Sequence, residues 1–170
     1  MNNEKKYAIG MYGGKFLPFH KGHDYCVRVA AQECETVYVL LFWGGAEEDD
    51  ILRQHPETWL SVEERTKQLG RICRDNTHLA HIIPALVDIS TLRLPDGSED
   101  WDAETPLVRS ILGNRLDAVY SSEPSYEEYF HRAYPEAEHR LVDARRIHYP
   151  ISGTMIRGMS DEGTREQWII

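Results

Sequence analysis

Short apolar segments alternate with segments of helical pattern along the chain, and this alternation limits the possible folds more than any other feature. Strands are predicted where apolar, β-branched and aromatic residues cluster, and helices where apolar residues recur every three or four positions. Five strands are expected, at residues 7–12, 36–43, 79–87, 116–122 and 139–144. Helices are expected at residues 24–34, 61–73, 98–112 and 125–134, with a last one beginning near Ser152.

Strands separated by helices form βαβ units, which require a mostly parallel sheet with right-handed crossovers. We therefore predict one domain over residues 1–170, with an α/β, Rossmann-like, doubly wound fold. Its parallel five-stranded sheet should have the order 3-2-1-4-5 and helices on both faces. Ligands of such sheets bind beyond the carboxyl ends of the strands, where the strand order reverses. The segments after strands one and four should therefore face one crevice.

Two prolines and an acidic run modify this prediction locally. Pro84 is expected to end the third strand and Pro106 to break the helix around it, because proline lacks a backbone N–H. Residues 44–58 contain two glycines, a proline and the run Glu47–Asp50, and are expected to form a long exposed loop. A metal site at the acidic run is the less favoured alternative.

The composition argues against several classes of partner. The net charge of −9 argues against nucleic acid, which is bound mainly through contacts of Lys and Arg with phosphates. No apolar run approaches the roughly 20 residues of a membrane span, and no signal peptide is recognised. The three cysteines include no C-x-x-C pair, which argues against a disulfide framework and suits a reducing compartment. A cytoplasmic protein without a nucleic-acid or membrane partner is therefore expected.

The segment GGKFLPFHKGH, residues 13–23, combines residues that suit a polyphosphate. Gly14 and its neighbour allow a sharp turn that brings backbone N–H groups close to a ligand. The following helix would begin near Gly22, and a helix N-terminus favours anions. His20 and His23 lie one turn apart and can face the same anion, and Lys15 adds a positive charge. Zinc is the alternative for the two histidines, but the sequence indicates no third ligand nearby, and the dinucleotide and Walker fingerprints are absent.

This segment resembles the signature of the HxGH nucleotidyltransferase superfamily, G-x-F-x-P-x-H-x-G-H. The pattern is matched by Gly14, Phe16, Pro18, His20, Gly22 and His23. The superfamily's second motif, I-S-x-T-x-I-R, is matched by ISGTMIR near the C-terminus. The resemblance implies a Rossmann-like fold in which the histidines contact the phosphates of a nucleotide. It also implies that Ser152, Thr154 and Arg157 bind its β- and γ-phosphates.

Together with YSSEPSYEEYF after the fourth strand, these motifs are similar to the NadR-type nicotinamide-mononucleotide adenylyltransferases. That resemblance implies transfer of AMP from ATP to nicotinamide mononucleotide, which gives NAD and pyrophosphate. Catalytic roles are implied for Lys15, His20, His23 and Arg157. Contacts with ATP are implied for Gly14, Phe16, His20, His23, Ser121, Ser122, Ser152, Thr154 and Arg157.

The acceptor site is less clearly indicated. The resemblance implies that an aromatic side chain stacks on the nicotinamide ring, and Trp101 lies in the comparable region, although a core position is an equal alternative. Arg109 and Arg65 could reach a substrate phosphate, but surface salt bridges are commoner for such residues. Mg²⁺ is expected to bind through the ATP phosphates, with no metal site formed by protein side chains. A homo-oligomer is a further expectation from the superfamily.

Two alternatives remain open at this point. One is another HxGH nucleotidyltransferase, with phosphopantetheine or a different phosphorylated small molecule as acceptor. The other is a domain that binds ATP or NAD as a sensor without turnover.

Overall fold

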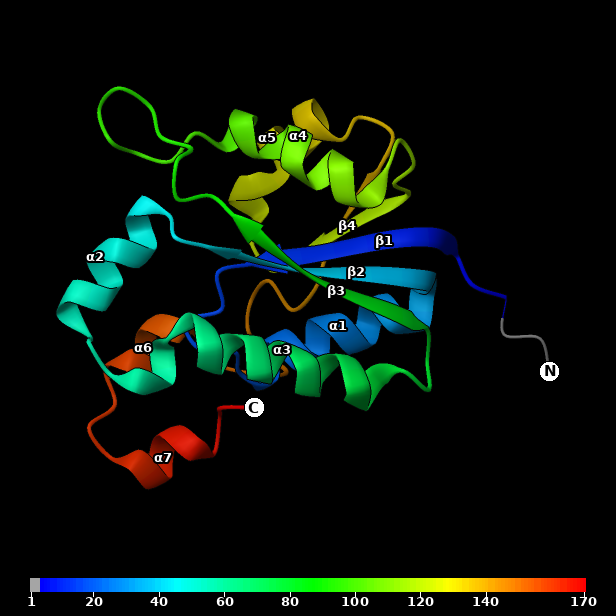
Figure 1. Ribbon diagram of the computed structural model, residues 1–170. Coiled ribbons are helices and arrows are strands. Elements are labelled where there is room, and N and C mark those ends of the chain that lie inside the picture. The colour runs from blue at the N-terminus through cyan, green and yellow to red at the C-terminus, as the bar shows by residue number, and fades with distance from the viewer. Residues whose placement is uncertain (1–3) are drawn as a thin grey trace.

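The computed structural model describes residues 4–170 and contains one five-stranded parallel sheet between two layers of helices (Figure 1). The sheet has the order β3-β2-β1-β4-β5, and every neighbouring pair is parallel. The strands are β1 (Tyr7–Gly14), β2 (Cys34–Trp43), β3 (His81–Asp88), β4 (Ala118–Ser121) and β5 (Glu138–Leu141). The predicted fold class and strand order are therefore confirmed.

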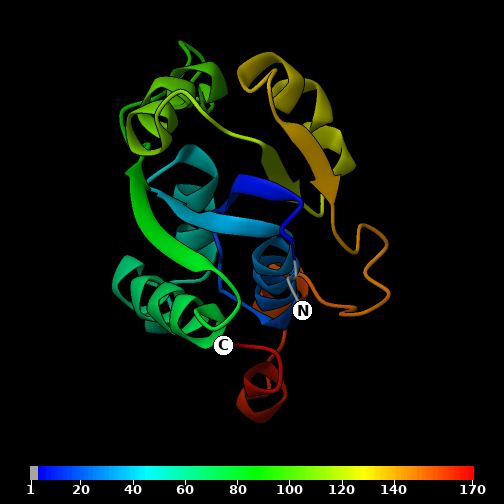
Figure 2. The same cartoon turned by 90° about the vertical axis from the view of Figure 1, so that its right-hand side faces the viewer.

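Helices cover both faces of this sheet, as Figures 1 and 2 show from two directions. Helices α1 (Lys21–Glu33) and α3 (Val62–Asn76) pack on one face, whereas α4 (Trp101–Leu112) and α5 (Glu127–Ala133) lie over the other. The remaining elements are α2 (Ala46–Gln54), α6 (Gly153–Arg157), α7 (Glu162–Glu166) and the 3-10 turns η1 (Thr58–Leu60) and η2 (Pro124–Tyr126).

The two cores follow from the two-residue period of the strands. Val39 and Leu41 of β2 join the cluster formed with α1 and α3, whereas Leu40 between them joins the cluster formed with α4. Successive side chains of a strand point to opposite faces, so a strand buried on both faces consists of apolar residues throughout. All three cysteines are free and buried within these layers.

Three local predictions were wrong. The acidic segment Ala46–Gln54 forms helix α2 instead of an exposed loop, and its acidic first turn complements the positive end of the helix dipole. Pro84 lies inside β3, which is tolerated because β3 is an edge strand and one side of its backbone needs no partner. Pro106 lies inside α4, where the packing of Val108 and Leu112 on the sheet keeps the helix continuous.

The order reversal lies between β1 and β4, which pair directly, with Gly10 opposite Ala118 and Tyr12 opposite Tyr120. The loops that leave the carboxyl ends of these two strands therefore begin next to each other. In the described part of the chain, no helix is both long and apolar enough to cross a membrane.

Candidate active site

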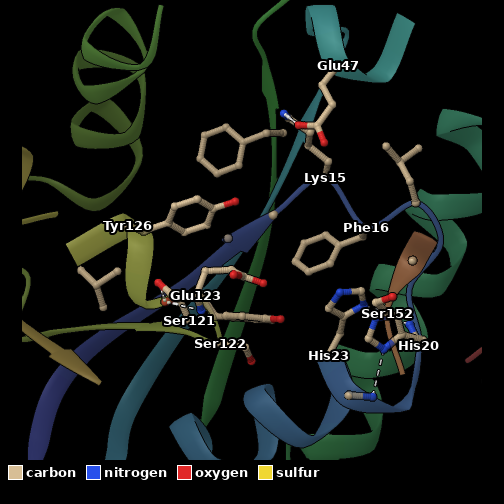
Figure 3. A pocket seen from close by; sticks show the side chains of 18 of the residues that line it. Lys15, Phe16, His20, His23, Glu47, Ser121, Ser122, Glu123, Tyr126 and Ser152 are labelled. Atoms are coloured by element: carbon tan, nitrogen blue, oxygen red, sulfur yellow. Dashed lines mark hydrogen bonds and ion pairs between the residues drawn. The ribbon is translucent and has the colours of Figure 1, made fainter. Parts of the chain in front are cut away.

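A cavity of about 350 Å³ opens at the carboxyl ends of β1 and β4 (Figure 3). Its walls come from the end of β1 with the β1–α1 loop and the first turn of α1, from α2 and α4, from the end of β4 through α5, and from the β5–α6 loop with α6. His20 and His23 line it together with Thr154 and Arg157, although the two pairs are far apart in the sequence. The segments that match the two motifs therefore meet at one cavity, which the long β5–α6 connection makes possible by returning the chain to the carboxyl end of β1.

The hydrogen bonds of the histidine pair define where their protons lie. The backbone N–H of His20 donates to Nδ1 of His23 (3.0 Å), and the backbone N–H of Gly22 donates to Nδ1 of His20 (3.1 Å). Each Nδ1 is an acceptor, so a neutral ring carries its proton on Nε2. The two rings stack with their centroids 3.6 Å apart and cap the start of α1. This arrangement leaves two Nε2–H groups for an anionic ligand.

Both imidazoles are neutral near pH 7. Burial and, to a smaller extent, the positive charge of Arg146 lower the pKa of His20 to about 3. Burial, His20 and Arg146 hold the pKa of His23 well below its usual value. Two stacked imidazoles near a guanidinium therefore act as neutral hydrogen-bond donors until an anion enters.

The second motif is tied to the first through Arg157. Its Nη1 donates to the carbonyl oxygen of Leu17 (2.7 Å) and its Nη2 to Oγ1 of Thr154 (3.3 Å). Ser152 caps α6 by accepting from the backbone N–H of Met155 (3.2 Å). Gly153 permits this close approach, because a Cβ there would lie 3.0 Å from the Leu17 oxygen.

Lys15 reaches the cavity but is already paired with carboxylates. Its ammonium group lies 2.9 Å from Glu99 and contacts Glu47 at the start of α2, as Figure 3 shows for Glu47. Burial alone would lower the pKa of Lys15, but the hydrogen bonds to the two carboxylates outweigh it, so the pKa is raised. A contact between Lys15 and a triphosphate would require it to leave these partners.

Ser121 at the end of β4 and Ser122 after it line the cavity, but their hydroxyl groups are engaged within the protein. Oγ of Ser121 lies 2.7 Å from Nε2 of His139, and Oγ of Ser122 donates to the carbonyl oxygen of Val142 (2.7 Å). On the opposite wall, Phe16 has a positive φ of 53° and stacks on Phe19 with centroids 3.9 Å apart. A Cβ on Gly14 would lie 3.0 Å from the Phe16 ring, so the glycine leaves room for it.

Trp101 lines the cavity, whereas Arg109 and Arg65, the candidates for a contact with a substrate phosphate, are not among the described residues that line it. The Trp101 ring meets Tyr126 and Tyr129 edge to face, with centroids 5.2 and 5.4 Å apart. Arg109 is not one of the described residues that line the cavity; it pairs with Glu136 at 2.6 Å.

Arg65 is completely buried, so the expected surface salt bridge is wrong, and it is not among the described residues that line the cavity. Its guanidinium pairs with Glu48, and Nη1 donates to the backbone oxygen of Lys15 (2.8 Å). It therefore supports the β1–α1 loop from behind.

Sequence reasoning missed three groups of this site. Arg146 donates to Glu123 (3.0 Å) and to the carbonyl oxygen of Ile151 (2.9 Å), and it is held by a loop in which Asp143 accepts three backbone N–H groups. Glu104 lines the cavity from α4, and Tyr126 lines it from η2. The sequence offered one indication of these residues: Arg146 follows a predicted strand, and Glu104 and Tyr126 lie near the start of α4 and η2, where loops reach the carboxyl edge of the sheet.

The described residues contain no cluster of three or more side chains able to hold a metal ion. Of the charged side chains that line the cavity, the carboxylates of Glu47 and Glu99 are already paired with Lys15. A metal here would need ligands from a bound molecule.

Comparison with known proteins identifies relatives of this fold and sequence. A family model described as cytidylyltransferase-like matches residues 11–159. The trifunctional NAD biosynthesis/regulator protein NadR of Escherichia coli is 26% identical over 162 residues, which are 90% of this chain but 37% of that protein. The chain therefore spans well under half the length of this relative.

Two solved structures share the fold at low identity. A NadR protein in complex with NAD and AMP-PNP gives a TM-score of 0.65 at 22% identity, over 98% of this chain and 46% of that one. A bifunctional NMN adenylyltransferase/ADP ribose pyrophosphatase of Francisella tularensis, complexed with AMP and a manganese ion, gives 0.58 at 19% identity, over 92% and 43%. At this level of sequence identity, the similarity shows a shared fold only.

Proposed function

This chain belongs to the cytidylyltransferase-like family of nucleotidyltransferases, and from that membership we propose that it transfers AMP from ATP to nicotinamide mononucleotide, with NAD and pyrophosphate as products. The observation that carries the proposal is the meeting of His20, His23, Thr154 and Arg157 at one cavity. The names of the relatives support the choice of acceptor, since they include NadR and an NMN adenylyltransferase.

The reaction needs positioning and charge neutralisation more than proton transfer. The nucleophile is a phosphate oxygen of nicotinamide mononucleotide, which is ionised at neutral pH and needs no general base. It attacks the α-phosphorus of ATP, and the bond to the β-phosphate oxygen breaks to release pyrophosphate. Catalysis then rests on groups that stabilise charge on the transferred phosphoryl group and the leaving group.

The site residues divide between these tasks. The Nε2–H groups of His20 and His23 would donate to oxygens of the α-phosphate, because both Nδ1 atoms are occupied as acceptors. Arg157 and Thr154 would bind the leaving pyrophosphate. Lys15 would join them after it exchanges Glu47 and Glu99 for phosphate oxygens.

A divalent cation fits this site only through its substrate. Mg²⁺ usually keeps several waters and binds through substrate phosphates, and it would supply charge neutralisation between them. The described part of the chain has no carboxylate cage that would compete with the phosphates for it.

The aromatic residues offer a place for the acceptor ring. Trp101, Tyr126 and Tyr129 line the cavity, and Figure 3 shows Tyr126 well away from the two histidines. A flat cationic pyridinium ring gains from contact with an aromatic face. We place the nicotinamide ring of the acceptor against these side chains.

The test measures the products directly. The protein is mixed with Mg²⁺, ATP or CTP, and a panel of phosphorylated acceptors, and pyrophosphate and the condensed product are quantified. NAD formed from nicotinamide mononucleotide and ATP is the expected result, and reactions without the protein or without ATP are the negative controls. Pyrophosphate release only with another acceptor, such as phosphopantetheine, would replace the proposed substrate. Tight binding of ATP without release would replace catalysis with sensing.

A further inference from the structure

We propose that Glu104 determines which form of the acceptor is used: its carboxylate accepts a hydrogen bond from the carboxamide of nicotinamide mononucleotide and repels the carboxylate of nicotinate mononucleotide. This inference rests on the proposed function, because it assigns the ring of the acceptor to the Trp101 region. The two acceptors differ only in this ring substituent, so a single charged side chain can discriminate between them.

Helix α4 brings Glu104 to the aromatic wall. Trp101 and Glu104 are three residues apart, which places them on the same side of the helix, and both line the cavity. The Tyr129 hydroxyl, which also borders this region, is already engaged: it donates to the backbone oxygen of Trp101 (2.9 Å) and lies 3.0 Å from Oγ1 of Thr105. A ring packed against Trp101 would therefore carry its substituent close to Glu104.

The carboxyl group of Glu104 is partly buried, and no described residue forms a hydrogen bond or an ion pair with it. Two other glutamates that line the cavity differ in this respect, since Glu99 pairs with Lys15 and Glu123 with Arg146. A partly buried carboxylate without a hydrogen-bond donor suits a ligand that supplies the donor, because a desolvated carboxylate gains strongly from a hydrogen bond.

The surroundings of Glu104 are acidic and do not neutralise it. The titratable and charged groups that act on it or lie beside it are Lys15 from the β1–α1 loop, Glu99 and Asp100 before α4, Tyr129 from α5 and Tyr134 after α5. The single cation among them, Lys15, is shared with Glu47 and Glu99. The carboxylate of nicotinate mononucleotide would be repelled by Glu104 and by the neighbouring Glu99. The amide N–H of nicotinamide mononucleotide would instead donate a hydrogen bond to Glu104.

The environment also makes the discrimination depend on pH. Burial and the neighbouring charge of Glu99 raise the pKa of Glu104 to about 7, so the carboxyl ionises within the range where the enzyme can be assayed. Above pH 7 the ionised Glu104 accepts a hydrogen bond from the carboxamide and repels the carboxylate of nicotinate mononucleotide. Below pH 7 it becomes neutral and can donate to a carboxylate, so the preference for the amide should fall.

The experiment compares kcat/KM for the two acceptors in the wild-type protein from pH 6 to pH 8.5. We expect the ratio of amide to acid to be about 100-fold at pH 8.5, and to fall about tenfold at pH 6, where about a tenth of the Glu104 carboxyls are ionised. The phosphate group of the two acceptors also titrates near pH 6 but is the same in both, so it cancels in the ratio.

Three variants separate a role in specificity from a role in structure. Glu104→Gln should lower the ratio at pH 8.5 about tenfold and make it independent of pH. Glu104→Asp keeps the charge and should retain a pH-dependent ratio. Glu128→Gln removes an exposed carboxylate of α5 that does not line the cavity, and it should match the wild type.

The outcomes distinguish the two proposals. If the wild-type protein makes no NAD from nicotinamide mononucleotide, the proposed function fails. If it does make NAD, but Glu104→Gln keeps the wild-type ratio and its pH dependence, Glu104 does not select the acceptor and only this inference is overturned.

Discussion

The buried ion pair between Glu48 and Arg65 gives the sharpest prediction for stability. Arg65 is fully buried and Glu48 is 3% exposed, and Oε2 of Glu48 also accepts from the backbone N–H of Gly44 (2.8 Å). Glu48→Gln keeps the shape and can keep the Gly44 bond, but it leaves the Arg65 charge buried without a counter-ion. Removing one partner of a buried pair typically costs about 3–5 kcal/mol.

That cost can be measured as a change in the free energy of unfolding. For a chain of this size, 1 kcal/mol corresponds to roughly 2–4 °C in the melting temperature, so Glu48→Gln should melt about 6–20 °C below the wild type. The variant should also lose activity, because Arg65 holds the backbone oxygen of Lys15 (2.8 Å) in the loop that forms the cavity.

A matched control lies on the same helix. Asp50 forms an exposed pair with Arg53, and exposed pairs contribute about 0–1 kcal/mol, so Asp50→Asn should leave the melting temperature nearly unchanged. Replacing both buried partners, as in Glu48→Leu with Arg65→Met, should recover much of the stability lost in Glu48→Gln. A Glu48→Gln protein that unfolds within 1 kcal/mol of the wild type would refute the reasoning.

Three further predictions concern the cavity. His20→Ala and Arg157→Ala should each lower kcat by about 10²–10³ with an unchanged circular dichroism spectrum; near-wild-type kcat would remove that residue from the mechanism. The pKa of His20 is lowered to about 3 in the folded state, so between pH 6.5 and pH 3 this group should lower the free energy of unfolding by up to about 1.4 kcal/mol per pH unit. In denaturation experiments over this range, His20→Asn should lose less stability per pH unit than the wild type. Gly153→Ala should displace the Leu17 carbonyl or Arg157 and reduce kcat at least tenfold. Gly158→Ala is the control, because a Cβ there meets only ordinary contacts. Equal kcat in the two variants would contradict a role for the close approach of Gly153 to Leu17.

The sequence predicts the parts of this protein that depend on local pattern. The order of strands and helices is predictable because apolar periodicity is a local property, and the meeting of the segments after β1 and β4 follows from the strand order alone. The crevice between these two segments could therefore be predicted without coordinates, whereas the arrival of Thr154 and Arg157 there, after β5, was implied only by the resemblance.

The parts that could not be predicted depend on contacts between distant segments. The acidic run of α2 has the composition of a solvated loop, but Glu48 within it is buried and pairs with Arg65, seventeen residues later in the sequence. Arg109 and Arg146 are similar in the sequence, yet one pairs with Glu136 away from the cavity and the other lies beside the histidines. Only the tertiary structure assigns a long side chain to one of several possible partners.

The charges that line the cavity explain how a protein with a net charge of −9 could bind two anionic substrates. Arg157 and Arg146 share the cavity with two neutral imidazoles whose free Nε2–H groups suit phosphate oxygens. The carboxylates of Glu99 and Glu104 border the same cavity from the segment around Trp101. A triphosphate is therefore favoured beside the arginines and opposed beside the carboxylates, whereas a cationic pyridinium ring has the opposite preference. If the proposed reaction is correct, this separation of charge within one cavity would orient both substrates, and the local field around the reacting groups would matter more for their binding than the net charge of the protein.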